Sequence, residues 1–475
     1  MRKTKFHKEC GGGRKYLFGF VLTCLQLAVP AAHAQWDNYN PAYPRIAARP
    51  HGTLLSGSAV DTDSRHIAKH HVAILATHRT WRLGGYDMAT LPAHIKSYNS
   101  NVKLFKYLNA NQFEKNGGTT NLDWIRKKLY DESGGGGNGD WWKRTTSGGH
   151  IAGSESNKLQ VNVTLQTKAD GSGLQWPQWF ARYWNAAPSD TGSWVAPSGY
   201  NKGRGLKEGA WDGVFQDDQY ISTGRFAPSN ADLNSDKLND LPHEERTRNW
   251  VVEGHIAVVD EWKKLQPSRL VLGQYAALAS ASEPDPSPLA GVHDGGLIQD
   301  ITRKDGQAGG WPIMMKAYRR GLSLASSPKI VIFHNKIEDL LHDNSDMNVY
   351  QANRYGLTSA LMDNGYYAVM APGQIRPEFD EFFGGKDHSV AKLGYLGYPK
   401  GGPQTAPWSQ GVYRREFDKG LVLVNPKGNG TRTVNVGSGW RRIDGAQDRN
   451  VNNGQSASSV TLREQDGIIL IRTSS

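Results

Sequence analysis

Cysteine is almost absent from this 475-residue sequence, which contains only Cys10 and Cys24. Both lie within the first 34 residues, which have the pattern of a leader peptide. A mature chain that begins at Gln35 would therefore contain no cysteine. This excludes a disulfide, a thiolate nucleophile and a cysteine-ligated zinc site from the mature protein.

Long hydrophobic runs are missing after the leader, and apolar residues make up 38% of the chain. The leader has a basic start, an apolar stretch over 16–29 and the cleavage signal Ala32-His33-Ala34. That stretch is too short for a good membrane span, and no later one is apolar enough. We therefore predict a signal peptide over residues 1–34, cleaved near Ala34, and an exported protein, periplasmic or secreted, with no membrane span.

Several signature motifs are also missing. No G-x-G-x-x-G follows a predicted strand, and neither G-x-S-x-G nor a P-loop occurs, so dinucleotide, serine-hydrolase and nucleotide-phosphate chemistry have no local support. The segment 232–236 begins like a calcium loop, but Lys237 replaces the required glycine and His243 the final glutamate. The sequence predicts no cofactor and no metal site.

Positive charge is modest once the leader is set aside. The formal net charge is +11 at pH 7, and removing the six basic residues and one acid of the leader leaves +6. Because the charge is dispersed and the protein is expected to be exported, we predict no nucleic-acid partner. Aromatic residues are plentiful, with 15 Trp and 19 Tyr. Their faces stack on sugar rings, although packing accounts for most of them.

Apolar strand-like runs alternate with helical segments from residue 66 onward. This alternation, over roughly 300 residues, favours an α/β fold of the (β/α)₈ TIM-barrel type over a doubly wound sheet. The predicted strands are 71–77, 103–109, 159–165, 211–217, 269–275, 296–301, 329–334 and 366–370. The predicted helices are 91–98, 122–130, 176–184, 244–265, 313–325 and 349–364.

The predicted domain organisation follows from changes in this pattern along the sequence. Residues 35–65 lack any period and are predicted to form an irregular N-terminal arm. Residues 66–402 would form the catalytic barrel. Residues 403–475 contain short strand-like runs separated by Gly, Asn and Asp, which predicts a small all-β sandwich.

The fourth predicted strand ends in two adjacent acids, Asp217 and Asp218. The C-terminal ends of barrel strands form the catalytic face, and a carboxylate there fits attack on an anomeric carbon. Asp217 is the first candidate nucleophile, and the alternative is an acid that caps the next turn. Asp218 would point the other way, to bind a sugar hydroxyl, orient a neighbour or itself be the nucleophile. Asp212, at the strand start, is interpreted as structural.

A glycosidase also needs a second carboxylate as acid. Asp300, at the end of the sixth predicted strand, would face the fourth strand across the barrel mouth. It could instead be a loop cap, and Glu283, Asp285 and Asp294 are rivals. A separation of about 5–5.5 Å between the two carboxylates predicts retention of configuration, and one of about 6.5–9.5 Å predicts inversion.

Other predicted strand ends supply polar and aromatic groups that are candidates for substrate binding. They would hydrogen-bond sugar hydroxyls, with Trp81 or Tyr275 as a stacking wall. Each one alone also fits a structural role. The set comprises His78, Arg79, Trp81, Asn109, Gln274, Tyr275, His334 and Asn335.

Two sets of motifs resemble known glycosidases. The run Asp212-Gly-Val-Phe-Gln-Asp217 resembles the D-G-[VI]-[FW]-x-D strand-four motif of retaining α-glycosidase barrels. The segments 354–367, 396–399 and 414–426, in that order, are similar to the hypothetical glycosyl hydrolase family 15, and the similarity extends from about residue 70 to 472. The resemblance implies a barrel followed by a β-sandwich, with Asp217 as nucleophile. Related clans place an acid on strand five or six, and strand five here ends in Gln274 and Tyr275, which leaves Asp300.

These observations predict an exported glycoside hydrolase that acts on a polysaccharide or oligosaccharide with retention, using Asp217 as nucleophile and Asp300 as acid/base. The rival interpretation is a non-catalytic glycan-binding or envelope polysaccharide assembly protein on a similar barrel, because fold does not fix function.

Overall fold

The structure is a computed structural model that describes residues 36, 38–49, 55, 59–77, 81–114, 124–131, 141–200, 204–219, 230–275, 278, 286–306 and 309–473. The predicted leader lies outside these residues. Within the described part of the chain, no helix combines the length and the apolar character needed to cross a membrane.

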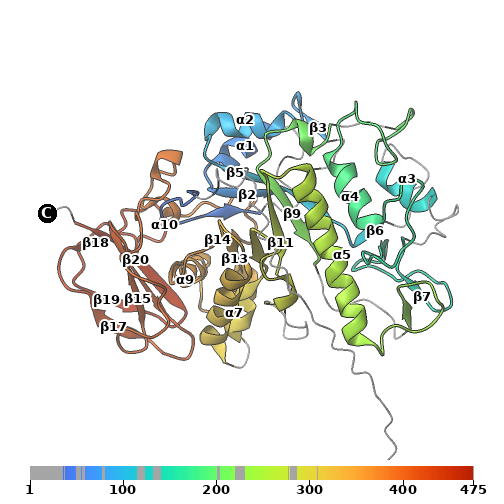
Figure 1. Ribbon diagram of the computed structural model, residues 1–475. Helices are drawn as coiled ribbons and strands as arrows, with labels where there is room; N and C mark the ends of the chain where they lie inside the picture. The colour runs from blue at the N-terminus through green and yellow to red at the C-terminus, as the bar shows by residue number, and fades with distance from the viewer. Residues whose placement is uncertain are drawn as a thin grey trace, which may run out of the picture.

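Eight parallel strands form the central sheet (Figure 1). In order, they are β1 (Ala47–Ala48), β2 (Val72–Leu75), β5 (Lys103–Asn109), β9 (Gly213–Asp217), β11 (Leu270–Gln274), β12 (Gly295–Ile298), β13 (Ile330–Lys336) and β14 (Tyr366–Met370). A parallel bridge between Ile46 and Tyr367 brings the last strand beside the first, so the sheet nearly closes into a barrel. The predicted α/β class with a parallel eight-stranded barrel is confirmed.

One predicted barrel strand is wrong. In the segment 159–165, the residues of β8 (Lys158–Gln160) pair antiparallel with β6 (Gln112–Glu114), outside the barrel. The missing strand is β1, which lies within the segment 35–65 that was predicted to be irregular. Because β1 contains only two alanines, it has no apolar alternation that sequence reading could detect. The two differences compensate, and β9 is the fourth barrel strand, as predicted.

Helices follow most of the barrel strands and cover the outside of the barrel (Figure 1). They include α1 (Val60–Ala68), α2 (Leu91–Tyr98), α3 (Trp124–Asp131), α4 (Trp176–Asn185), α5 (Glu244–Leu265), α7 (Gly310–Leu324), α8 (Ile337–His342) and α9 (Val349–Leu361). The predicted bounds of α2 and α5 agree to the residue. Helix α4 is rich in aromatic residues because it buries Trp176, Trp179 and Tyr183 in the layer between barrel and helices.

The barrel interior is filled by side chains at alternate strand positions. Phe105, Phe215, Leu272 and Ile332 belong to one buried apolar cluster. Because side chains alternate across a strand, the inward-facing positions at the C-terminal strand ends are Asn109, Asp217, Gln274 and His334. The fold therefore directs one polar residue from each of four strands into the same mouth.

The C-terminal part of the chain is a small all-β unit beside α9 (Figure 1). One antiparallel sheet has the order β15 (Tyr413–Glu416), β16 (Gly420–Asn425), β20 (Asp466–Arg472) and β18 (Trp440–Arg442), and a second pairs β17 (Arg432–Asn435) with β19 (Ser459–Leu462). Residues from both sheets, such as Leu421 and Val434, share one buried cluster. All six strands lie within residues 403–475, where short strand-like runs were predicted.

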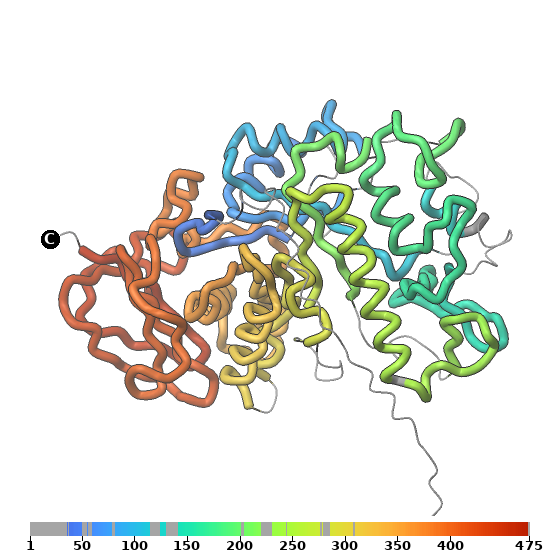
Figure 2. Tube along the Cα trace, in the orientation of Figure 1, coloured from blue at the N-terminus to red at the C-terminus, as the bar shows by residue number. Residues whose placement is uncertain are grey.

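Polar contacts attach this unit to the barrel. The buried Arg415 on β15 donates to the carbonyl oxygens of Leu361 and Asp363, at 3.0 and 2.6 Å. Arg354 on α9 is paired with Asp466 at 3.1 Å. The N-terminal segment joins the same region, because the Tyr43 N–H donates to the Gly397 carbonyl, and Figure 2 shows this blue segment against the orange part of the chain.

Candidate functional site

Asp217 is the last residue of β9, and its side chain is buried in the barrel mouth, with the residue 7% exposed. The hydroxyl of Tyr107 on β5 donates to Oδ2 at 2.5 Å, and Nη2 of Arg49 lies 3.7 Å from the same oxygen. The other oxygen, Oδ1, is buried and has no hydrogen-bond partner among the described residues. Asp217 therefore has one oxygen that is held and one that is free to contact a ligand.

Electrostatics around Asp217 act in both directions. Burial raises the pKa of its carboxyl group, the Arg49 cation lowers it and the neighbouring Asp218 raises it, with a net raised pKa. Burial and the Asp217 carboxylate also raise the pKa of Tyr107 strongly, so the phenol stays protonated and remains a donor.

Asp218 lies in the loop just after β9, with a left-handed backbone at φ 54°. Its Oδ2 accepts hydrogen bonds from the amides of Asn109, at 2.6 Å, and Gln112. Its backbone N–H donates to Oε1 of Gln274 at 2.9 Å, and its carbonyl accepts from the amide of Asn111. These bonds engage Asp218 in holding the turn, which leaves the inward position to Asp217.

Asp300 follows β12 by two residues and also has a left-handed backbone, at φ 52°. Nδ1 of His334 on β13 lies 3.2 Å from its backbone nitrogen and 3.1 Å from Oδ1. A neutral histidine can donate from Nδ1 to the carboxylate or accept from the N–H, according to its tautomer. Burial raises the pKa of Asp300, but His334, Arg49 and Lys336 together bring it below its usual value.

A chain of hydrogen bonds joins the two acidic segments. Asp218 donates to Gln274, whose Nε2 donates in turn to Oε1 of Gln299 at 2.9 Å, one residue before Asp300. Arg49 lowers the pKa of both Asp217 and Asp300 through its charge. The structure thus brings together six of the predicted site residues: Asn109, Asp217, Asp218, Gln274, Asp300 and His334.

Three predicted binding residues lie away from this cluster. The half-buried Trp81 packs on the outer apolar layer, and its indole N–H donates to the Leu55 carbonyl at 3.0 Å. Tyr275 is 2% exposed and packs edge-on against His293. Asn335 is buried and bonds to the Tyr367 hydroxyl and the Ala352 carbonyl. Tyr275 and Asn335 follow inward-facing strand residues by one position, so the same alternation turns them outward.

Of the remaining candidates, four stay untested and two lie away from the mouth. His78, Arg79, Glu283 and Asp285 lie outside the described residues. The other two lie at the opposite end of the strands. Asp294 precedes β12 and accepts from the Val271 N–H at 2.8 Å. Asp212 precedes β9 and accepts from the Leu104 N–H at 2.8 Å, in the structural role assigned to it.

Sequence reasoning missed Arg49, Tyr107 and Gln299. Tyr107 precedes Asn109 by two positions on β5, so strand alternation would have found it once Asn109 was placed inside. Gln299 could have been found in the same way from Leu297. Arg49 could not, because it follows the two-alanine strand β1 in a segment without a pattern.

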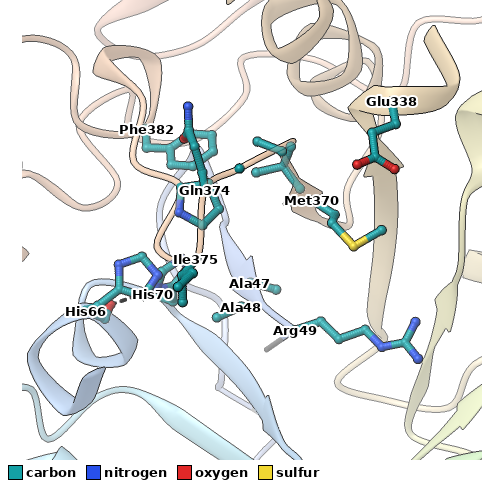
Figure 3. Close-up of a pocket in the computed structure, with 14 residues that line it drawn as sticks. Ala47, Ala48, Arg49, His66, His70, Glu338, Met370, Gln374, Ile375 and Phe382 are labelled. Atoms are coloured by element: carbon teal, nitrogen blue, oxygen red, sulfur yellow. Dashed lines mark hydrogen bonds between the residues drawn. The ribbon is translucent and has the colours of Figure 1, made fainter. Parts of the chain in front are cut away.

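A cavity of about 340 Å³ lies beside Arg49, at the C-terminal ends of β1 and β14. Figure 3 shows Arg49 extending toward the side where Glu338 lies, away from His66 and His70, which line the opposite wall. Met370, Ile375 and Phe382 add apolar surface. Elsewhere in the described part of the chain, as here, no three His, Cys, Asp or Glu residues are grouped to hold a metal ion.

The arrangement combines a buried inward-facing carboxylate, a second carboxylate just after another strand, an arginine whose charge lowers the pKa of both, and an adjoining cavity. Two carboxylates at the mouth of a barrel are the groups that glycosidic bond cleavage requires. The amides of Asn109 and Gln274 add donors and acceptors suited to sugar hydroxyls.

Comparison with solved structures finds similar chains, among them two described as alpha-amylases. Eubacterium rectale Amy13B aligns with a TM-score of 0.50 at 9% identity, over 94% of this chain and 99% of that one. The alpha-amylase from Geobacillus thermoleovorans in complex with acarbose has a TM-score of 0.48 at 11% identity, over 91% and 99%. The alpha-amylase from Lactobacillus plantarum has 0.48 at 10%, over 90% and 99%. At these identities the likeness concerns the fold alone.

No curated protein matches the chain. The family model described as hypothetical glycosyl hydrolase family 15 matches residues 204–421, a segment that begins just before β9 and ends in β16. It includes both candidate carboxylates, Asp217 and Asp300. The resemblance predicted from the sequence motifs is therefore confirmed: in residues 204–421, the chain matches the hypothetical glycosyl hydrolase family 15.

Proposed function

We propose that the protein is an exported glycoside hydrolase that cleaves O-glycosidic bonds in a polysaccharide or oligosaccharide with retention of configuration. The family match supports glycoside hydrolase activity at the family level. The observation that carries the proposal is the buried carboxylate of Asp217, which faces the barrel mouth with Oδ1 unpartnered among the described residues. Export after cleavage near Ala34, a C-terminal sandwich domain and a carbohydrate partner belong to the same proposal.

In this mechanism, Oδ1 of Asp217 attacks the anomeric carbon while the glycosidic C–O bond breaks. Asp300 donates its proton to the departing oxygen. Asp300 then takes a proton from water, whose oxygen attacks the anomeric carbon and releases Asp217 as a carboxylate. Tyr107 and Arg49 stabilise the carboxylate of Asp217 before attack and after release.

The pKa directions favour the same pair with exchanged roles as a second candidate. Burial leaves the pKa of Asp217 raised, as an acid requires, whereas His334 helps to lower the pKa of Asp300, as a nucleophile or base requires. Two carboxylates whose pKa values are displaced in opposite directions are typical of an acid and its partner. The motif places the nucleophile at Asp217, so the two assignments differ in a measurable way.

Leaving-group dependence distinguishes these roles. The purified protein, Asp217→Asn and Asp300→Asn would be assayed on a panel of bacterial polysaccharides and on activated aryl glycosides of the sugars released. We expect both variants to lose about 10²–10⁴-fold or more on the natural glycan. Because a good leaving group needs no proton, Asp300→Asn should retain kcat/KM on the aryl glycoside, although its kcat falls because Asp300 is also the base of the second step. Asp217→Asn should lose both.

The opposite pattern on the aryl glycoside would assign the acid to Asp217. Full activity of either variant on the natural glycan would remove that residue from the mechanism. Saturable glycan binding that survives both substitutions, without cleavage by the wild type, would instead support the glycan-binding or envelope-assembly function.

A further inference from the structure

Arg49 is a buried cation with an incomplete set of partners. Its side chain is 9% exposed, and Nη2 lies 3.7 Å from Oδ2 of Asp217. The other guanidinium nitrogen, Nη1, is buried and has no hydrogen-bond partner in the part of the chain that the structure describes. A buried N–H of a charged group is costly to leave unpaired, so this atom marks a position where an acceptor from a ligand is favourable.

The cavity beside Arg49 has room for such a ligand. At about 340 Å³, it has the size of a small-molecule site, which suits one or two sugar rings. Other charged groups of its wall already have partners: His66 lies 3.0 Å from Glu378, and Glu338 lies 3.7 Å from Lys336. The apolar side chains of Met370, Ile375 and Phe382 offer contacts for the C–H faces of a ring.

Arg49 also connects the cavity to the candidate nucleophile. Oδ1 of Asp217, the residue that Nη2 of Arg49 faces, is likewise buried without a hydrogen-bond partner among the described residues. A ring seated against Nη1 would lie next to Asp217, because the same guanidinium group faces both.

We propose that this cavity is a sugar-binding subsite and that Arg49 is its specificity and positioning residue. Nη1 donates a hydrogen bond to an oxygen of the bound sugar, while Nη2 stabilises the carboxylate of Asp217. The inference rests on the proposed function and deepens it. The shared chemistry is an oxygen acceptor, either a hydroxyl group of a neutral sugar or the carboxylate of a uronic acid, for which the planar guanidinium fork is well shaped.

Binding would be measured by calorimetry on the full chain in an Asp300→Asn background, which slows turnover. The probes are maltotriose and cellotriose as neutral sugars and trigalacturonate as an acidic one. We expect at least one probe to bind, and Arg49→Gln to weaken that binding at least tenfold. Loss confined to trigalacturonate would identify a carboxylate ligand, and loss on a neutral probe a hydroxyl group.

Two further variants separate binding from folding. Arg49→Lys keeps the charge but not the fork, so it should weaken binding while its melting temperature stays near that of the parent. Arg449→Gln removes an exposed arginine of the C-terminal unit and should bind as the parent does. Binding of no probe by the parent, or equal binding by the parent and Arg49→Gln, would overturn the inference.

The pH profile of hydrolysis is a further test, because it would not change if the role of Arg49 were purely structural. The groups that face Asp217 are Arg49, Tyr107 from β5 and Asp218 from the end of its own strand. Loss of the Arg49 cation should move the acid limb of hydrolysis to higher pH, and Arg49→Lys should leave it in place. Absence of hydrolysis with intact, Arg49-dependent binding would contradict the proposed function but not the subsite.

Discussion

At the scale of single residues, the site depends on how Asp217 is held. One oxygen accepts from Tyr107 at 2.5 Å and faces Arg49, while the other has no partner among the described residues. Asp218, its neighbour in sequence, is engaged by side-chain amides instead. Two adjacent acids of the same type therefore have different environments, which sequence reasoning expected from strand alternation but could not assign to particular partners.

The hydroxyl of Tyr107 is expected to matter for the ionisation of Asp217. Its hydrogen bond lowers the pKa of Asp217, so Tyr107→Phe should raise that pKa and move the acid limb of kcat/KM to higher pH. Because a hydrogen bond to a charged group is worth about 1.5–3 kcal/mol, kcat/KM should fall roughly ten- to hundredfold. The check is a pH–rate profile.

Tyr395→Phe is the matched control, because that hydroxyl donates to the Glu381 carbonyl, away from the mouth. If both variants showed the same profile as the wild type, Tyr107 would have no part in setting the charge of Asp217.

At the scale of elements, β9 determines where Asp217 points, and its register depends on Gly213. A Cβ at this position would collide with the carbonyl of Leu270 on β11 and with the ring of Phe105 on β5. We expect Gly213→Ala to cost about 1–3 kcal/mol of stability. Gly171→Ala should be nearly neutral, since a Cβ there meets nothing within 4 Å. Chemical denaturation measures both, and equal stabilities would show that β9 tolerates separation from β11.

Sequence patterns predicted the long or apolar elements well and the short ones poorly. Helix α5 and the C-terminal strands were found because their periods are clear. The run 159–165 alternates like a barrel strand, yet antiparallel pairing with β6 holds its first residues outside the barrel. Strand β1 forms because its backbone pairs with β2 and its preceding residue, Ile46, pairs with Tyr367. The strand propensity of its two alanines does not account for it. Arg49 was missed for the same reason, because it follows β1. Site residues were predicted only at the ends of strands with a clear apolar pattern.

At the scale of the whole molecule, an ionic cluster ties α1, the segment after β14 and the C-terminal unit together. Glu378 lies between His66 and His388, and His388 contacts Asp380 at 3.0 Å. Asp380 in turn accepts from the backbone N–H of Gln447 at 2.7 Å. His66 belongs both to this cluster and to the lining of the cavity beside Arg49.

This cluster predicts a pH dependence of stability. Hydrogen bonds with Asp380 and Glu378 raise the pKa of His388 from 6.5 to about 9. Because the pKa of His388 is higher in the folded protein than in the unfolded chain, its protonation stabilises the folded state. This stabilisation is complete below about pH 6.5 and is lost as the pH rises toward 9. The melting temperature of the wild type should therefore decline over this interval more steeply than that of His388→Gln. Parallel curves for the two proteins would show that His388 does not contribute.

The central claim, that Asp217 rather than its neighbour performs the chemistry, is tested most directly by comparing Asp217→Asn with Asp218→Asn. Each variant removes one charge from the same strand end. On whichever polysaccharide the wild type cleaves, we expect Asp217→Asn to lower kcat/KM by about 10³-fold or more, and Asp218→Asn by about tenfold through a loosened turn. The reverse order, or equal losses, would contradict this account.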